Sequence, residues 1–396
     1  MADRPRLSVC VPSRNRQPCF QQTILNLIAS DRSDVEFVFA DNSDDPSVMT
    51  GFLGTISDPR IVYLPSADRV LSMKENWERT VACATGDWIS VIGDDDFLDL
   101  DLADLISRIE ARYPGVEAIG WNRSTFEWPE ARTVERSGPV TLVNRVRPMP
   151  VERMFNSLFR WAGATLLPAC PFGIYHAAAS RRVIDRIRTR YGENLFEHPV
   201  VDYDFSHKLI HLGASLVYVE RPLSILGVSN ASNSAAANDP DRSRDVIAAY
   251  RAENGDRYEQ EVRAAGFPFG GSASNAANIM AAQFWFKHHY GIEIDGWQEN
   301  FLRCLANECR LRENRQSFDE MLALCRDSLS RWEGGRFLAG FSPTYQEEHG
   351  TIAPGGLHGQ VLRVNQAIGG AATPAEFLSI IRQILPAISE LDFTDG

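Results

Sequence analysis

The chain has 396 residues, of which 44% are hydrophobic and 23% are charged, and its formal net charge is −12. This composition is ordinary for a folded protein of two or three domains and argues against a disordered chain. The acidic balance also argues against a nucleic-acid-binding protein, which needs a basic surface facing the phosphates; an anionic small ligand at a locally basic site stays open.

Neither a membrane span nor a leader segment is expected. No apolar run reaches the length of about 18 residues that a transmembrane helix needs, and the first residues lead directly into a strand-like segment rather than a signal peptide. The seven cysteines, at positions 10, 19, 83, 170, 304, 309 and 325, are scattered and lack C-x-x-C spacing. They are interpreted as reduced thiols of a cytoplasmic protein, without a structural zinc site.

The pattern of apolar residues over residues 7–115 predicts alternating strands and helices. Short continuous apolar runs predict strands at residues 7–11, 35–40, 61–64 and 88–92. Helices are predicted around residues 20–28, from a Ser72–Glu75 capping box to residue 84, and from an Asp101 cap to residue 113. Strands of this kind are buried on both faces, so the pattern predicts an α/β domain with a mostly parallel sheet covered by helices.

The remainder of the chain changes from a mixed to a helical pattern. Residues 120–170 are irregular and predict a β-rich or loop-rich insert; a strand at 172–176, helices beginning at Ser180 and at Asp202, and a strand at 216–219 follow. Residues 229–245 are rich in Ser, Asn, Ala and Asp and are interpreted as a linker. Helical patterns then occupy residues 279–290, 301–311, 318–332 and 374–388. We therefore expect an α/β domain at residues 1–235 and a mainly α-helical domain at residues 236–396.

Three adjacent carboxylates, Asp94, Asp95 and Asp96, follow the fourth predicted strand directly. Such groups repel one another, and burying them without partners is costly. A divalent cation removes this conflict, because Mg²⁺ and Mn²⁺ prefer oxygen ligands and often share one or two carboxylates with the phosphates of a substrate. The alternative is an acidic helix start stabilised by the helix dipole, a role that Asp99 and Asp101 already fill. A Mn²⁺ or Mg²⁺ site is favoured.

Two further polar loops follow the first and second predicted strands. The loop from Pro12 through Ser13, Arg14 and Asn15 to Arg16 offers donors for phosphate and carbonyl oxygens. Asp41 can accept a hydrogen bond from a base or ribose, or it can close the strand as an Asx turn. Ligands of open α/β sheets bind at the carboxyl ends of the strands. The sequence lacks G-x-G-x-x-G and G-x-x-x-x-G-K-[ST], which argues against a dinucleotide-binding Rossmann domain and a P-loop NTPase.

Asp202 and Asp204 stand at the head of a predicted helix. A carboxylate there can take a proton from an acceptor hydroxyl, or it can cap the helix, a task that needs only one Asp. The histidines at positions 176, 198, 207 and 211 lack a metal-ligand spacing apart from the i, i+4 pair His207 and His211, and are interpreted as packed or surface residues.

The motifs VCVPSRNR, VFADNSDD, GDWISVIGDDDFL and VVDYDFSHKLIHLG, in this order, resemble the family 2 glycosyltransferases of the GT-A fold over about residues 6–228. The resemblance implies that the nucleotide is bound by Pro12, Ser13, Arg14, Asn15 and Asp41. It also implies that Asp94, Asp95 and Asp96 form the DXD motif, with Asp94 and Asp96 as metal ligands and Asp96 as the direct one, and that Asp202 is the catalytic base. Gly93 and Val201 stand where many members carry Asp and Glu, and no His near residue 226 supplies a third metal ligand.

The implied activity is inverting, metal-dependent transfer of a sugar from a nucleoside-diphosphate sugar, with UDP favoured, to a hydroxyl of a glycan or lipid-linked acceptor, in polysaccharide or glycoconjugate synthesis. The alternatives are a nucleotidyltransferase that makes a sugar nucleotide and a catalytically inactive binding module; a glycoside hydrolase, which also uses two carboxylates, ranks lower. The C-terminal helices, including the aromatic one around Trp285, are candidates for acceptor binding, for assembly of a homo-oligomer, or for peripheral contact with the inner face of a membrane.

Overall fold

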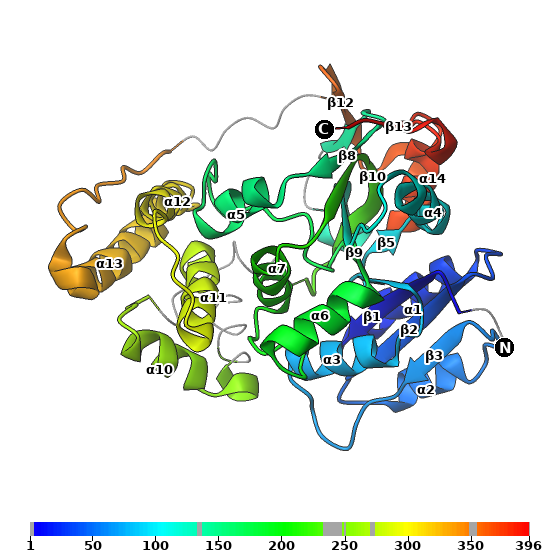
Figure 1. Cartoon of the computed structure of the whole chain (residues 1–396), viewed down its shortest axis with the longest axis horizontal. Helices are drawn as coiled ribbons and strands as arrows, with labels where there is room; N and C mark the ends of the chain where they lie inside the picture. Colours follow the sequence, from blue (N-terminus) through cyan, green and yellow to red (C-terminus); the bar gives the residue numbers. More distant parts are fainter. Residues whose placement is uncertain are drawn as a thin grey trace.

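The computed structural model describes residues 4–132, 137–232, 248, 251–269, 274–347 and 355–395. Its centre is a ten-stranded sheet of order β13-β8-β10-β6-β9-β4-β1-β2-β3, with β5 paired to β10 (Figure 1). The strands are β1 (Leu7–Ser13), β2 (Val35–Asp41), β3 (Ile61–Leu64), β4 (Trp88–Val91), β5 (Phe97–Leu98), β6 (Ala118–Glu127), β8 (Arg145–Met149), β9 (Ala177–Ser180), β10 (Leu216–Val228) and β13 (Asp392–Phe393).

The strands at the centre of the sheet run mostly in one direction. β1 is parallel to β2 and β4, β2 to β3, and β6 to β10. β9 is antiparallel to both of its neighbours, β4 and β6, and β8 is antiparallel to β10. The carboxyl ends of β1, β2, β4, β6 and β10 therefore meet at one edge, and the predicted mostly parallel α/β sheet is confirmed.

Helices bury both faces of this sheet. One apolar cluster joins Val9 and Val11 of β1 to α1 (Gln17–Ile28), α2 (Ser47–Leu53) and α4 (Leu102–Arg112). The other joins Cys10 of the same strand to α3 (Met73–Cys83), α6 (Arg181–Tyr191) and α7 (Val201–His211). Successive side chains of a strand point to opposite faces, so this double covering explains why the strands are continuous apolar runs in the sequence.

One of the two predicted helix caps is formed, and the predicted helix start at Ser180 is capped as well. Ser72 accepts a hydrogen bond from the Glu75 backbone N–H, and the Glu75 carboxylate accepts one from the Ser72 N–H at 2.8 Å, which is the predicted capping box. Ser180 accepts from the Val183 N–H at the start of α6. The prediction for Asp101 is wrong, because its side chain makes no cap hydrogen bond and pairs with Arg382 instead.

The irregular region 120–170 contains most of β6, together with β7 (Ser137–Thr141), β8 and α5 (Val151–Phe159). The strand predicted at residues 172–176 does not form. Tyr175 makes only an isolated bridge to Val91, and the strand β9 begins at Ala177. The reason is local: Ile174 and His176 have φ angles of 60° and 52°, which are incompatible with an extended strand.

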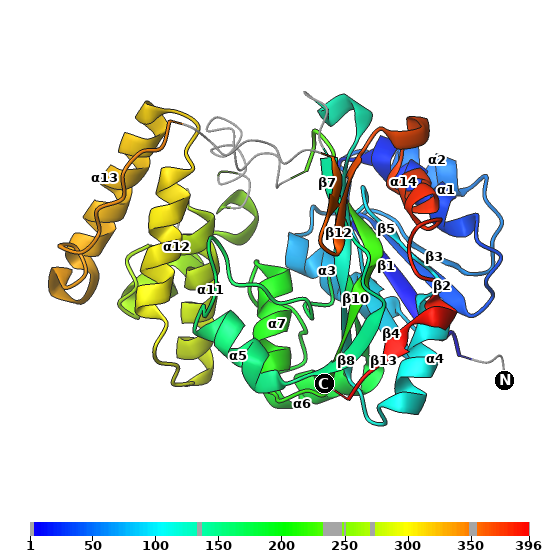
Figure 2. The ribbon, with the colours of Figure 1, turned by 90° about the horizontal axis from the view of Figure 1, so that it is seen from above.

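A helical region follows the sheet domain. The helices α10 (Arg257–Ala264), α11 (Asn275–Tyr290), α12 (Gln298–Arg310) and α13 (Arg315–Arg331) gather on one side of the sheet, with α7 between them and the strands (Figures 1 and 2). α11 packs against α7. Within the described ranges, no helix is long and apolar enough to cross a bilayer. The predicted boundary at residues 235 and 236 lies outside the described residues.

The last part of the chain returns to the sheet. β11 (Gly356–His358) and β12 (Val361–Asn365) join β7 in a three-stranded sheet, and β13 pairs with β8. α14 (Pro374–Ile381) packs on β10 and β5. The region expected to be mainly α-helical, residues 236–396, therefore also contains, within residues 355–395, short strands that join the sheets. Strands of two to five residues are too short for a two-residue period to be visible in the sequence.

Candidate active site at the carboxyl edge of the sheet

The loops after β1, β2 and β4 meet and are joined by hydrogen bonds. The Asn15 backbone N–H donates to Ser43 Oγ at 3.0 Å, and the Asn15 side chain donates to the Asp44 carboxylate and accepts from the Asp44 N–H, both at 2.9 Å. Ser13 Oγ donates to Asp94 Oδ2 at 2.6 Å. The three segments that the sequence marked as nucleotide-binding or metal-binding thus form one connected polar surface.

The individual residues of the first two loops have unequal access to this surface. Pro12 lies inside the sheet, opposite Ala40 of β2. Asp41 is fully buried and forms an Asx turn: Oδ1 accepts from the Ser43 N–H at 3.0 Å and from Ser43 Oγ at 2.6 Å, and Oδ2 accepts from Ser66 Oγ at 3.2 Å. Arg14 pairs with Glu253, and its Nη2 lies 3.8 Å from Asp44 Oδ1.

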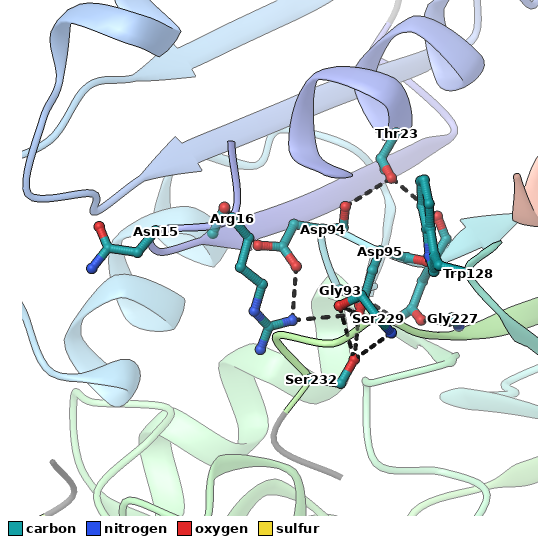
Figure 3. Close-up of polar contacts among 12 residues, drawn as sticks. Asn15, Arg16, Thr23, Gly93, Asp94, Asp95, Trp128, Gly227, Ser229 and Ser232 are labelled. Carbon is teal, nitrogen blue, oxygen red and sulfur yellow. Dashed lines mark hydrogen bonds and ion pairs between the residues drawn. The ribbon is translucent and has the colours of Figure 1, made fainter. Parts of the chain in front are cut away.

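Asp94 is bound by two groups of the first loop. Its Oδ2 accepts from Ser13, and its Oδ1 accepts from Arg16 Nη1 at 3.0 Å (Figure 3). Burial raises the pKa of the Asp94 carboxyl to about 7, against the opposing effect of the Arg16 guanidinium. The Asp94 backbone carbonyl accepts from Thr23 Oγ1 at 2.9 Å, which fixes the turn against α1.

Asp95 is bound on one side only. Its Oδ2 accepts from Ser229 Oγ at 2.9 Å and from Ser232 Oγ at 2.6 Å, and Arg16 Nη1 lies 3.5 Å away (Figure 3). Its Oδ1 accepts no hydrogen bond from the described residues. Trp128 Nε1 donates to the Asp95 backbone carbonyl at 2.9 Å. Burial, and then the neighbouring charge of Asp96, raise the pKa of Asp95.

Asp96 is held by the protein on both oxygens. Oδ2 accepts from the Gly93 N–H at 2.6 Å and from Tyr175 Oη at 2.8 Å, and His176 Nε2 lies 2.9 Å from it. Oδ1 accepts from the Gly227 N–H at 2.7 Å. Burial acts to raise the pKa of Asp96, but His176, the Gly227 N–H and Tyr175 outweigh it, so the pKa is lowered. Asp96 thereby ties the end of β4 to β10 and to residues 175–176.

Two glycines allow the acidic turn to pack closely. A Cβ atom at position 93 would lie 2.8 Å from Asp96 Oδ2 and 3.1 Å from Asp95 Oδ1. A Cβ atom at position 227 would lie 1.7 Å from the Asp95 carbonyl oxygen. The carboxylates of Asp95 and Asp96 therefore fill the space that a side chain at position 93 would need, which explains why glycine stands there.

Three residues around this turn hold left-handed backbone conformations. Asn15, Ile174 and His176 have φ angles of 55°, 60° and 52°. For a β-branched residue such as Ile174 this is a strained conformation. Sparsely populated backbone conformations cost about 1–3 kcal/mol each and concentrate at functional sites, where the surrounding contacts hold them. Here the contacts are those of Asn15 with Asp44 and of His176 with Asp96.

Asp202 stands in the first turn of α7 and is partly exposed. Its backbone carbonyl accepts from Ser206 Oγ at 2.7 Å, and a Cβ atom at Gly173 would lie 3.3 Å from that carbonyl. Residues 173–176 therefore run from Asp202 to the Tyr175 and His176 contacts of Asp96. Burial raises the pKa of Asp202, with Arg123 among the groups that oppose the rise.

Asp204 has a different role from Asp202. Its Oδ2 accepts from the backbone N–H groups of Glu197 and His198 at 2.7 and 3.1 Å and from Lys208 Nζ at 3.1 Å. Asp204 and Lys208 are both fully enclosed. Neither Asp caps α7 with its side chain. The second carboxylate of the Asp202–Asp204 motif thus holds the loop before the helix.

Several site residues were not assigned from the sequence. Ser229 and Ser232 lie in a Ser-rich stretch interpreted as a linker, and His176 was interpreted as packed or exposed. Arg16 was noted in the first loop, but nothing in the sequence placed it on the acidic turn. Among the described residues, no group of three or more His, Cys, Asp or Glu side chains is arranged to hold a metal ion.

Comparisons with known proteins give a family and a set of distant folds. Residues 8–186 match the model described as Glycosyl transferase family 2. No curated protein matches the chain. Among solved structures, TarS residues 1–349 from S. aureus is 10% identical with a TM-score of 0.42, over 85% of this chain and 90% of that one.

Two further solved structures are similarly distant. The mannosyltransferase PcManGT from Pyrobaculum calidifontis, in complex with GDP-Man and Mn²⁺, is 15% identical with a TM-score of 0.38, over 86% of this chain and 84% of that one. TarS residues 1–349 with UDP-GlcNAc is 10% identical with a TM-score of 0.41, over 81% and 83%. Likeness at this level carries no inference about the ligands of this chain.

Proposed function

We propose, from the match of residues 8–186 to the model of glycosyl transferase family 2, that this chain is an inverting, cation-dependent glycosyltransferase. It moves a sugar from a nucleoside-diphosphate sugar, with UDP as the favoured nucleotide, to a hydroxyl of a glycan or lipid-linked acceptor. The observation that carries the proposal is the junction of the Asn15, Asp44 and Asp94 loops at one edge of the sheet. Ligands of open α/β sheets bind at this edge.

The nucleotide is proposed to lie on the loops after β1 and β2. Ser13, Arg14 and Asn15 carry the polar groups of the first loop, and Pro12 sets its direction. Asp41 acts indirectly in this proposal, because Ser43 and Ser66 already occupy its two carboxylate oxygens.

The cation is proposed to bind Asp95 and Asp94. This differs from the expectation for Asp96, because four groups of the protein surround that carboxylate. Asp95 Oδ1 accepts no hydrogen bond within the described residues, and a pair of carboxylates suits Mg²⁺ or Mn²⁺, which fill their remaining positions with phosphate oxygens and water. When bound, the cation offsets the charge that develops on the departing diphosphate.

Asp202 is the proposed general base. It takes the proton of the acceptor hydroxyl, whose oxygen forms a bond to the anomeric carbon while the bond from that carbon to the diphosphate oxygen breaks. Attack from the face opposite the diphosphate inverts the anomeric configuration. A raised pKa suits a base that must work near neutral pH. The helices α10–α13, which meet α7 through α11, are proposed to contribute to acceptor binding.

Asp202→Asn tests this assignment. We expect sugar transfer to fall at least ~10²-fold, the lower limit for removal of a positioned base, while nucleoside-diphosphate affinity measured by calorimetry stays unchanged. Asp204→Asn is the matched control: it is expected to lower the melting temperature instead, because Lys208 loses a buried partner. Transfer by Asp202→Asn at the wild-type rate would refute the role of Asp202.

A screen of sugar nucleotides with Mn²⁺ separates the remaining alternatives. A glycosyltransferase releases a nucleoside diphosphate from its donor, and the screen also identifies the base and the sugar. Release of pyrophosphate from a nucleoside triphosphate and a sugar phosphate would instead establish a nucleotidyltransferase. Failure to bind or turn over any of these compounds would establish an inactive binding module.

A further inference from the structure

The Asp94–Asp95 pair already holds a positive charge that belongs to the protein. Arg16 Nη1 lies 3.0 Å from Asp94 Oδ1 and 3.5 Å from Asp95 Oδ2, so one guanidinium nitrogen bridges the two carboxylates (Figure 3). The Asp94 and Asp95 side chains are only 3% and 5% exposed, and that of Arg16 is 20% exposed. Arg16 is therefore the counter-ion that makes burial of these two carboxylates tolerable.

A divalent cation on the same two carboxylates competes with this guanidinium. A cation bound to Asp94 and Asp95 with Arg16 in place would lie within a few ångströms of a like charge in a poorly solvated position, which is strongly unfavourable. The hydroxyl partners, Ser13, Ser229 and Ser232, are neutral and do not create this conflict. Arg16 is thus the group that must leave for the cation to bind.

We propose that Arg16 is an exchangeable counter-ion: the divalent cation displaces it from Asp94 and Asp95, and the freed guanidinium pairs with the diphosphate of the donor. This inference rests on the proposed function, which supplies the cation and the diphosphate. A guanidinium binds phosphate oxygens with two parallel hydrogen bonds. The exchange conserves ion pairing, because the diphosphate replaces the carboxylates as the partner of Arg16.

Binding of the cation and of the nucleotide is therefore coupled. The cation alone has to displace Arg16 into solvent, whereas the cation together with a nucleoside diphosphate gives Arg16 a new partner. Each ligand then increases the affinity for the other, as linkage requires. Without Arg16, the cation meets two carboxylates that have lost their counter-ion.

The test is titration of Mn²⁺ alone into the wild-type protein, Arg16→Ala and Arg14→Ala, followed by calorimetry or by the electron paramagnetic resonance signal of free Mn²⁺. We expect Arg16→Ala to bind Mn²⁺ about tenfold more tightly than the wild type, a typical size for coupling between sites. Arg14→Ala is the control. It removes the same charge from the same loop, but Arg14 pairs with Glu253 rather than with Asp94 or Asp95. The Mn²⁺ affinity of this variant is therefore expected to match that of the wild type.

Repeating the titrations with UDP or GDP present tests the second half of the exchange. Addition of nucleotide is expected to tighten Mn²⁺ binding more in the wild type than in Arg16→Ala. Arg16→Gln, which keeps a hydrogen-bond donor without the charge, replaces Arg16→Ala if the latter does not fold.

Two results overturn the proposal, and they are distinguishable. If Arg16→Ala or Arg16→Gln binds Mn²⁺ no more tightly than the wild type, while the wild type releases a nucleoside diphosphate from a sugar nucleotide, the exchange is wrong and the proposed function stands. If the wild type binds neither Mn²⁺ nor a nucleoside diphosphate and turns over no sugar nucleotide, both are wrong.

Discussion

At the scale of single residues, the acidic turn shows that adjacent identical side chains can have different tasks. Asp94 faces the first loop, Asp95 faces the end of β10 and leaves one oxygen without a hydrogen bond from the described residues, and Asp96 is enclosed by protein donors. The pKa shifts follow this division, since the pKa is raised for Asp94 and Asp95 and lowered for Asp96.

The pair Asp95→Asn and Asp96→Asn separates cation binding from structure. Asp95→Asn is expected to abolish Mn²⁺ binding with little change in the free energy of unfolding. Asp96→Asn is expected to cost about 1–3 kcal/mol, because an amide cannot accept from the Gly93 N–H, the Gly227 N–H and Tyr175 at once and leaves a buried donor unsatisfied. Calorimetric Mn²⁺ titration and urea unfolding measure the two quantities. If Asp96→Asn abolished Mn²⁺ binding and Asp95→Asn lowered the free energy of unfolding instead, Asp96 would be the direct ligand of the cation.

Gly93→Ala tests the close packing of the turn. The added Cβ would lie 2.8 Å from Asp96 Oδ2, and we expect a loss of about 1–3 kcal/mol in unfolding free energy, as for overpacking elsewhere, together with lower activity. Gly51→Ala in α2 is the matched control, because a Cβ there meets nothing within 4 Å. The control is expected to be neutral or stabilising. A stable, active Gly93→Ala protein would contradict the packing argument.

From the sequence, the convergence of the candidate site residues at one edge of the sheet was easier to predict than the contacts among them. Asp94, Asp41 and Asn15 each follow a strand, and parallel strands bring such residues to one edge whatever the details of the loops. The contacts of Arg16 and Ser229 depend on how loops far apart in the chain approach each other. No local pattern records that approach, so these residues could not be assigned.

At the scale of elements, the packing of α7 against α11 encloses the imidazole of His207. Within the part of the chain that the structure describes, neither ring nitrogen of His207 has a hydrogen-bond partner, and the ring lies 5.1 Å from Phe159 and 5.4 Å from Phe286, measured between centroids. Burial, and then the charge of Lys208, lower the pKa of His207 to about 3. The folded protein therefore keeps this imidazole neutral under mildly acidic conditions.

His207→Phe is expected to flatten the pH dependence of stability. The unfolded chain takes up a proton near pH 6.5 and the folded chain only near pH 3, so stability is lost as the pH falls between these values. At pH 5 the loss is about 2 kcal/mol for one such histidine. Unfolding of wild type and variant at pH 7 and pH 5 measures the difference. His288→Phe, at an exposed position of α11, should leave the wild-type dependence unchanged.

The prediction of helices and strands succeeded where burial or capping leaves a clear pattern in the sequence. β1, β2 and β4 were predicted because both of their faces are covered, and α3 because Ser72 and Glu75 form a capping box. The strand expected at residues 172–176 failed because the positive φ of Ile174 is imposed by its surroundings and leaves no trace in an apolar sequence. The short strands β11 and β12 carry no readable period.

At the scale of the whole molecule, the C-terminal segment completes the sheet domain. α14 places Phe377 and Leu378 on an apolar cluster with Phe126 and Ile225. Arg382, which follows α14, pairs with Asp99 only three residues beyond the acidic turn, and Asp99 is fully buried. The end of the chain therefore packs against the sheet and holds the segment that follows the acidic turn.

Truncation tests this support. A protein of residues 1–232 exposes the apolar surface under α14 and is expected to be less stable and more prone to aggregation than the same residues joined by a flexible linker to residues 355–396. Soluble yield, dye binding to exposed apolar surface and thermal unfolding of the two proteins give the comparison. Equal stability of both would show that residues 355–396 are dispensable for the sheet domain.

The approach of Gly227 to the Asp95 carbonyl leaves no space between β10 and the acidic turn. The turn and the last residues of β10 are therefore in direct contact, and we expect a displacement of one to displace the other. Ser229 and Ser232 follow β10 directly in the chain. Their hydroxyl groups both donate to Asp95 Oδ2, so we expect such a displacement to carry the donors of this carboxylate with it.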